Sequence, residues 1–220
     1  FFNIHSERVF EPDKLTLLRS IAVLMSAVWV VRFVDQQGWR GLGRLRFSNP
    51  AAVSHKPFVL PIVALVVVYI LSTLFSINPR ISWAGSYQRL QGTYTTLAYV
   101  LIFALMAATI RTPEQVRRVV SVAIATSIPV ALYGLLQHFG HDPLPWGGDV
   151  QTRVAGQMGN AIFIAAYLIM VIPLTLARIV DAFTNILGDE KLAAADVLRS
   201  SIYIFTLAIQ LLTLYWSGSR

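Results

Sequence analysis

The chain has 220 residues, of which 55% are hydrophobic and 13% are charged, and its formal net charge at pH 7 is +7. So few charged residues leave too little polar surface to coat a water-soluble globule, and the apolar residues fall in long runs, which is typical of a membrane protein. The basic residues are spread along the chain and form no continuous stripe, so nucleic acid is not expected as a partner. The absence of cysteine excludes disulfides, thiolate metal ligands and a cysteine nucleophile.

Six apolar stretches predict an all-α, polytopic transmembrane protein of about six spans, folded as a single transmembrane domain over residues 1–220. A helix needs about 20 residues to cross a hydrocarbon core of about 30 Å. In chain order the predicted spans are 15–34, 57–75, 94–110, 119–137, 161–180 and 202–216. The third and sixth are short for a span, and Pro173 is expected to kink the fifth. The apolar runs are continuous, which favours helices over the alternating pattern of barrel strands.

The positions of Lys and Arg predict how the spans are oriented. Eleven of them lie in or beside the connections after spans one, three and five, and seven lie on the opposite side. The eleven are Arg32, Arg40, Arg44, Arg46, Lys56, Arg111, Arg117, Arg118, Arg178, Lys191 and Arg199, and the seven are Arg8, Lys14, Arg19, Arg80, Arg89, Arg153 and Arg220. The side with eleven is therefore predicted to be cytoplasmic, and contact with anionic lipid headgroups explains most of the net charge.

This orientation places both ends of the chain outside. The sequence starts Phe1-Phe2-Asn3 without an initiator methionine, which fits a cleaved signal peptide, a missing upstream span or a chain that begins partway along. We favour a missing upstream span. The last residues, Ser217-Gly218-Ser219-Arg220, form a polar turn directly after a span, where further chain is expected. We therefore interpret the sequence as a fragment of a longer polytopic protein.

Three arginines stand out in the short polar segments that are predicted to lie outside. They are Arg89, Arg153 and Arg220. Arg153 is followed by Gly156, Gly159 and Asn160 before the fifth span, so backbone N–H groups at the start of that helix can join the guanidinium in binding an anion. Beside a membrane, phosphate is the anion we expect. A structural role stays open, in which the arginines anchor the helix ends at the headgroups, the glycines permit a tight helix entry and Asn160 is the N-cap.

The same outer segments contain histidines and aromatic residues. His138, His141 and Asp142 are close neighbours in the connection before the fifth span, and we interpret them as polar residues of the membrane interface. The alternative is that His141 and Asp142 form a proton-transfer pair. The aromatic residues Trp83, Tyr87, Trp146 and Trp216 are typical of an interfacial belt, although such rings also stack on sugar faces.

Short motifs at the predicted outer ends of the spans carry a family resemblance. They read Ser-Tyr-Gln-Arg-Leu-Gln-Gly at 86–92, Arg-Val-Ala-Gly-Gln-Met-Gly-Asn at 153–160 and Ser-Gly-Ser-Arg at 217–220. With Phe-Phe-Asn at 1–3 and Val-Phe-Glu-Pro-Asp-Lys-Leu at 9–15, they resemble the O-antigen ligase and O-antigen polymerase superfamily of bacterial membrane glycan transferases. The resemblance covers nearly the whole chain, as the amino-terminal part of such a protein.

The resemblance implies a transferase of the bacterial plasma membrane that works without a metal or another cofactor. Such an enzyme moves a glycan from an undecaprenyl-pyrophosphate carrier to an acceptor hydroxyl on the outer face. Arg153, with Arg89 and Arg220 as partners, is implied to bind the pyrophosphate, and Gly156, Gly159 and Asn160 are supporting residues. The family's catalytic histidine is expected in a later loop, beyond Arg220. The implied partners are membrane lipids and the lipid-linked glycan donor.

Two other classes of membrane protein are alternatives to the transferase. A transporter or channel usually has ionisable residues inside its spans, and the centres of these spans hold almost none. A non-catalytic membrane subunit that stabilises a larger complex, with other membrane subunits as its partners, stays open as the alternative. The sequence alone thus leaves it undecided whether the chain is an enzyme.

Overall fold

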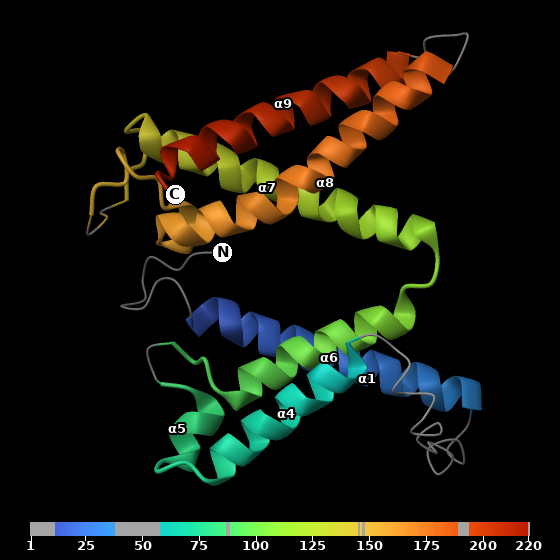
Figure 1. Cartoon of the computed structure of the whole chain (residues 1–220), viewed down its shortest axis with the longest axis vertical. Helices are drawn as coiled ribbons and strands as arrows, with labels where there is room; N and C mark the ends of the chain where they lie inside the picture. The colour runs from blue at the N-terminus through green and yellow to red at the C-terminus, as the bar shows by residue number, and fades with distance from the viewer. Residues whose placement is uncertain are drawn as a thin grey trace. The chain divides into compact units, whose positions relative to one another are not determined.

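The computed structural model describes residues 12–37, 58–86, 89–144, 146, 148–188 and 194–219. Every regular element in these ranges is helical, which confirms the predicted all-α class. The elements are α1 (Pro12–Gln37), α4 (Val59–Leu74), α5 (Pro79–Ala84), α6 (Thr93–Thr109), α7 (Pro113–His138), the 3₁₀ turn η1 (Gly156–Met158), α8 (Ala161–Gly188) and α9 (Ala194–Trp216) (Figure 1). Each predicted span overlaps one helix, whereas α5 and η1 were not predicted.

The helices α1, α7, α8 and α9 are long and apolar enough to cross a membrane. Helices α4 and α6 are apolar but shorter, with 16 and 17 residues, which at 1.5 Å per residue gives roughly 24–26 Å. The prediction that the sixth span is short is wrong: α9 begins at Ala194 and has 23 residues. The chain is therefore a polytopic helical membrane protein.

Exposed and buried side chains are distributed as a lipid environment requires. Large apolar residues are exposed along the helices, for example Leu24, Val28 and Val31 on α1. Polar side chains are buried instead, including Ser127, Thr206, Gln210 and Thr213, all with no exposed surface. This is the reverse of a soluble globule, because lipid tails solvate the apolar side chains while polar groups find their partners between helices.

The helices group into two compact units, Phe1–Arg111 and Thr112–Arg220, and each unit is described by itself. The interpretation of the chain as a single domain stays a prediction.

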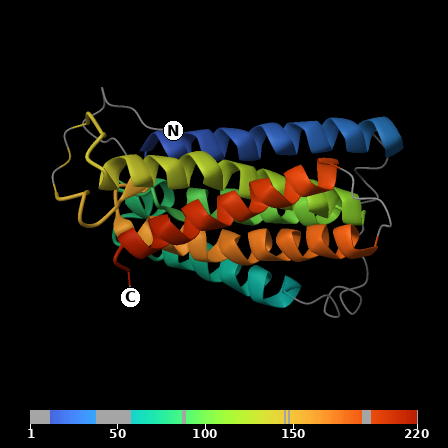
Figure 2. The same cartoon turned by 90° about the horizontal axis from the view of Figure 1, so that it is seen from above.

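In the second unit, α7, α8 and α9 lie side by side, and α8 runs antiparallel to the other two (Figures 1 and 2). Helix α7 begins at a capping box in which the Thr112 side chain accepts the Gln115 N–H and the Gln115 side chain accepts the Thr112 N–H. The core of the unit is a cluster of Ala131, Val154, Ile164, Leu168, Ile172 and Ile209. Both α7 and α8 continue through an internal proline, Pro129 and Pro173 respectively.

Small and hydroxyl residues bring α7 and α9 close together. A Cβ atom at Gly134 would lie 2.6 Å from Cγ2 of Thr213, so a larger residue at this crossing would force the helices or the Thr213 side chain to shift. The Thr213 hydroxyl donates to the Ala131 carbonyl at 2.9 Å, and Nε2 of Gln210 donates to Oγ of Ser127 at 2.6 Å. Such close approach and interhelical hydrogen bonding replace the hydrophobic effect as the source of helix association in lipid.

In the first unit, α1 packs on α6, and α4, α5 and α6 contact one another. Helix α5 begins with Pro79 at its first position and Asn78 as N-cap, whose side chain accepts the Ile81 N–H. The hydroxyls of Thr73 on α4 and Thr93 on α6 are 2.6 Å apart and both residues are buried. These contacts fix the segment between α5 and α6, which carries Arg89.

Candidate functional site

Arg153 lies in the α7–α8 loop (residues 139–160) and is fixed to the end of α9. Its Nε donates to the carbonyl oxygen of Ser217 at 3.3 Å, and the next residue, Val154, donates its N–H to the Trp216 carbonyl at 3.1 Å. Arg153 is exposed, and within the described residues its two terminal amino groups have no hydrogen-bond partner. The guanidinium is thus held at one edge, with the rest of its donors directed at solvent.

The turn after α9 packs between Arg153 and the start of α8. Ser217 has no exposed surface, and its hydroxyl donates to the Leu214 carbonyl. The Ser219 hydroxyl donates to the carbonyl of Ala161, the first residue of α8, at 3.2 Å. The structure therefore brings Arg153 together with the segment that leads directly to Arg220, while Arg220 itself lies outside the described residues.

Gly156 supports this arrangement through its backbone rather than by offering a free N–H group. Its φ is +57°, and a Cβ atom would lie 2.6 Å from Cδ1 of Ile164. Its N–H donates at 2.7 Å to Oε1 of Gln137, a buried side chain on α7 that also accepts the Ala155 N–H at 3.3 Å. These two N–H groups are therefore bonded within the protein, and the supporting role of Gly156 in anion binding stays a prediction.

Gly159 and Asn160 complete the entry into α8. Gly159 has φ of +70° and ends η1 in the left-handed region, where glycine carries no steric cost. Oδ1 of Asn160 accepts the Ile162 N–H at 2.9 Å, and the Asn160 carbonyl accepts the Phe163 and Ile164 N–H groups. Asn160 is thus the N-cap of α8, and its supporting role in anion binding stays a prediction.

Asp142 is the centre of a hydrogen-bond network that sequence reasoning missed. Its Oδ2 accepts from the Tyr133 hydroxyl at 2.8 Å, from Nε2 of Gln137 at 3.1 Å and from Nε1 of Trp146 at 2.7 Å, and its Oδ1 accepts the Leu144 N–H. Burial raises the pKa of Asp142, but these donors together outweigh it and hold the pKa below its ordinary value. Asp142 therefore stays ionised and orders the loop.

The two histidines of the α7–α8 loop are placed differently from each other. His138 stacks on Trp216 with ring centroids 4.0 Å apart, and its Nδ1 lies 2.7 Å from the Gln151 carbonyl. His141 is exposed, and the side chains hydrogen-bonded to Asp142 are those of Tyr133, Gln137 and Trp146, so His141 and Asp142 do not form the alternative proton-transfer pair.

A polar pocket of about 280 Å³ opens in the same loop. Its lining consists of Gln137, Gly140, Asp142, Leu144, Trp146, Gly148, Asp149, Val150 and Gln151. Asp149 accepts from the Thr152 hydroxyl and from two backbone N–H groups, which lowers its pKa. Carboxylates, an amide and an indole ring are groups that bind hydroxyls and stack on apolar sugar faces. Gln151 lies two residues from Arg153, so pocket and arginine share one loop.

Arg89 belongs to the first unit and is exposed between α5 and α6. The loop around it closes tightly, because a Cβ atom at Gly85 would lie 2.4 Å from the Gln91 nitrogen and one at Gly92 would lie 2.3 Å from the Gly85 nitrogen. Leu90 adopts a positive φ of 52°. Arg89 is thus an exposed residue beside a tightly constrained stretch of backbone within its own unit.

Arg19 on α1 holds that loop and was not singled out from the sequence. Its Nη2 donates to the carbonyls of Ala84 at 2.8 Å and Leu90 at 2.6 Å, and its Nε donates to Oγ1 of Thr95 at 2.9 Å. Its guanidinium carbon also lies 4.7 Å above the Tyr94 ring. The sequence signal was an arginine inside a predicted span, since such residues need partners in the protein.

Comparison with protein-family models, with curated proteins and with solved structures finds no match to the chain. The fold defines a class, that of polytopic helical membrane proteins. The activity is a matter of proposal.

Proposed function

We propose that this protein is a glycan transferase that takes its donor from a lipid-linked pyrophosphate carrier at the predicted outer face of the membrane. The observation that carries the proposal is Arg153, held by Ser217 through Nε alone, with its terminal amino groups open to solvent. A fork of N–H donors at the membrane edge suits the two negatively charged phosphates of such a carrier.

The chemistry explains why an arginine is useful here. The acceptor hydroxyl forms a bond to the anomeric carbon of the donor sugar while the bond from that carbon to the pyrophosphate oxygen breaks. The electron pair goes to the pyrophosphate, whose negative charge grows. The hydroxyl proton goes to a base, and none of the described residues is assigned this role. Arginine donors that bind the leaving group more tightly as its charge grows lower the barrier.

Two further features support the proposal. The loop pocket that contains Asp142 and Trp146 offers polar side chains and an aromatic ring on the same loop as Arg153. The resemblance of segments 86–92, 153–160 and 217–220 to O-antigen ligases and polymerases points to the same substrate class. Arg89 and Arg220 are proposed as further pyrophosphate ligands on the strength of that resemblance.

The test is release of undecaprenyl pyrophosphate from a labelled lipid-linked glycan by the full chain in bacterial membranes. Arg153→Ala is expected to reduce the release rate about a hundredfold, which corresponds to about 3 kcal/mol in the barrier. Arg80→Ala is the matched control, since Arg80 is an exposed arginine of α5 on the same predicted side. Arg153→Lys keeps the charge but loses the fork, and an intermediate rate is expected.

Two outcomes would count against the proposal. Equal rates for wild type and Arg153→Ala would remove Arg153 from the donor site. If the wild type releases no undecaprenyl pyrophosphate with any acceptor tested, the alternative of a non-catalytic membrane subunit is favoured.

A further inference from the structure

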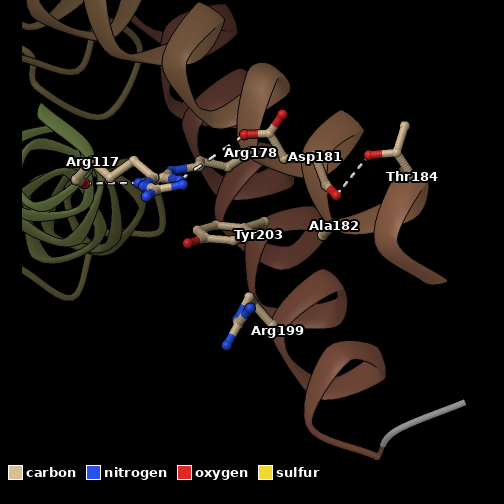
Figure 3. Close-up of a pocket in the computed structure, with 7 residues that line it drawn as sticks. All are labelled: Arg117, Arg178, Asp181, Ala182, Thr184, Arg199 and Tyr203. Carbon is tan, nitrogen blue, oxygen red and sulfur yellow. Dashed lines mark hydrogen bonds and ion pairs between the residues drawn. The ribbon is translucent and has the colours of Figure 1, made fainter. Parts of the chain in front are cut away.

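At the end of the second unit opposite the α7–α8 loop, the start of α7, the end of α8 and the start of α9 enclose a cavity of about 370 Å³. Its polar lining consists of Arg117, Arg178, Asp181, Thr184, Arg199 and Tyr203 (Figure 3). This volume lies within the range of small-molecule sites in proteins, about 300–1,000 Å³. We call it the three-arginine cavity after Arg117, Arg178 and Arg199.

Arg178 is the most enclosed of the three arginines, with 15% of its side chain exposed. Its Nη2 donates to the Arg117 carbonyl at 2.7 Å and to Oγ of Ser121 at 3.1 Å, so it bridges α8 to α7. Its Nε is buried and has no hydrogen-bond partner among the described residues. A buried N–H of a charged group without an acceptor costs free energy.

The charges around the cavity leave an excess of positive charge. Asp181 lies 4.0 Å from Arg178, but its side chain is 70% exposed and therefore screens the arginine weakly. Asp196 pairs with Arg199 at 3.6 Å from outside the lining. The three positive charges of the arginines therefore exceed the two negative charges of the aspartates. Figure 3 shows the Tyr203 ring extending from α9 next to Arg178, with the Arg199 side chain on the other side of that ring. The Tyr203 hydroxyl adds an uncharged donor.

We propose that the three-arginine cavity binds a phosphate group, and that its physiological source is the headgroup of an anionic phospholipid. Guanidinium groups bind phosphate through paired N–H donors. The cavity lies at the end of the helices that the positive-inside distribution predicts to be cytoplasmic, where anionic lipid gathers. The exposed apolar side chains of Val180, Phe183 and Leu198 flank it on α8 and α9, where acyl chains can cover them. The inference is independent of the proposed transfer reaction.

The experiment titrates the purified full chain in detergent with short-chain phosphatidylglycerol, with phosphatidylcholine of the same chain length and with inorganic phosphate. Bound lipid is counted by native mass spectrometry, and the thermal midpoint is followed for all three probes. Arg117→Gln and Arg199→Gln each remove one charge from the cavity, and both residues are exposed enough to be replaced without disrupting a core. Arg118→Gln is the matched control, because Arg118 is the next residue on α7 and pairs with Glu114 outside the cavity.

The proposal expects phosphatidylglycerol to bind more tightly than phosphatidylcholine, and each cavity variant to weaken that preference about fivefold while Arg118→Gln retains it. Stabilisation by inorganic phosphate alone, lost in the same two variants, supports the phosphate site and assigns its source to soluble phosphate. Equal binding of both lipids without any effect of phosphate overturns the proposal. An equal loss in Arg118→Gln also overturns it, because general attraction by the basic surface then explains the binding.

Discussion

Oε1 of Gln137 accepts the Gly156 N–H at a distance of 2.7 Å, so a buried amide at the end of α7 supports the turn that precedes α8. Nε2 of the same side chain donates to Asp142, which orders the first half of the loop. One glutamine therefore connects both halves of the α7–α8 loop, and the loop that carries Arg153 depends on it.

Replacing Gly156 by alanine tests how much this turn contributes. The new Cβ would lie 2.6 Å from Cδ1 of Ile164 at a φ of +57°, so we expect a loss of about 1–3 kcal/mol in the free energy of unfolding. Thermal unfolding in detergent measures it. Gly148→Ala is the control, because a Cβ at Gly148 meets nothing within 4 Å. Adding Ile164→Val should recover part of the loss by removing the clashing methyl group, and no recovery would contradict the steric explanation.

The network around Asp142 predicts a dependence of stability on pH. The pKa of Asp142 in the folded protein is below its ordinary value of 3.8, so its contribution is present at neutral pH and is lost as the pH falls through 3.8 and then through the lower folded value. We expect Asp142→Asn to lower the free energy of unfolding at pH 7 by about 1–2 kcal/mol, because charge-assisted hydrogen bonds are weakened. The measurement is the thermal midpoint of both proteins between pH 7 and pH 3.

At pH 3 the difference between wild type and Asp142→Asn should shrink. Asp149→Asn serves as comparison, since Asp149 is exposed in the same loop and bonds only to nearby residues. A larger effect of Asp149→Asn than of Asp142→Asn would contradict the central place of Asp142.

Replacing Arg19 tests how much its hydrogen bonds stabilise the first unit. Arg19→Lys keeps the charge but cannot reach Ala84, Leu90 and Thr95 together, so we expect a loss of about 2–3 kcal/mol, as for hydrogen bonds to a charged group. Limited proteolysis in the loop around Arg89 should accelerate in parallel. Arg80→Lys on exposed α5 should change neither quantity, and equal proteolysis of both variants would exclude a specific role of Arg19.

Ser127 on α7 and Gln210 on α9 form a buried hydrogen-bonded pair. Replacing one residue or the other distinguishes the cost of losing the hydrogen bond from the cost of leaving a polar group unpaired. Nε2 of Gln210 donates to Oγ of Ser127, whereas its Oε1 is buried without a partner in the described part of the chain. Gln210→Leu removes both polar groups of the amide and should be nearly neutral, while Ser127→Ala leaves the amide unpaired and should cost about 1 kcal/mol. A double-mutant cycle measured by unfolding in detergent checks this, and a coupling energy near zero would show that the bond adds nothing.

The sequence predicted every long helix, because runs such as those of α7 and α8 have a composition that admits no other structure in lipid. It did not predict α5, since six residues are too few to show periodicity, nor the full length of α9, since Asp196, Arg199 and Ser200 interrupt its apolar run.

The candidate site was predicted only in part. Arg153 and the 217–219 turn are adjacent, whereas the grouping of Arg153 with Arg89 and Arg220 stays a prediction. The role of Gln137 could not be read from the sequence, because one amide in an apolar helix gives no sign of which distant N–H groups it accepts. The same holds for the four donors that meet at Asp142, which come from α7 and from the loop.

Arg19 also shows that a basic residue can serve the protein rather than the lipid. Its guanidinium keeps its charge, but its N–H groups donate to carbonyl and hydroxyl oxygens of its own chain. Those donors are therefore not available to lipid phosphates, and a count of the seven basic residues on the predicted outer side overstates how many of them can bind headgroups.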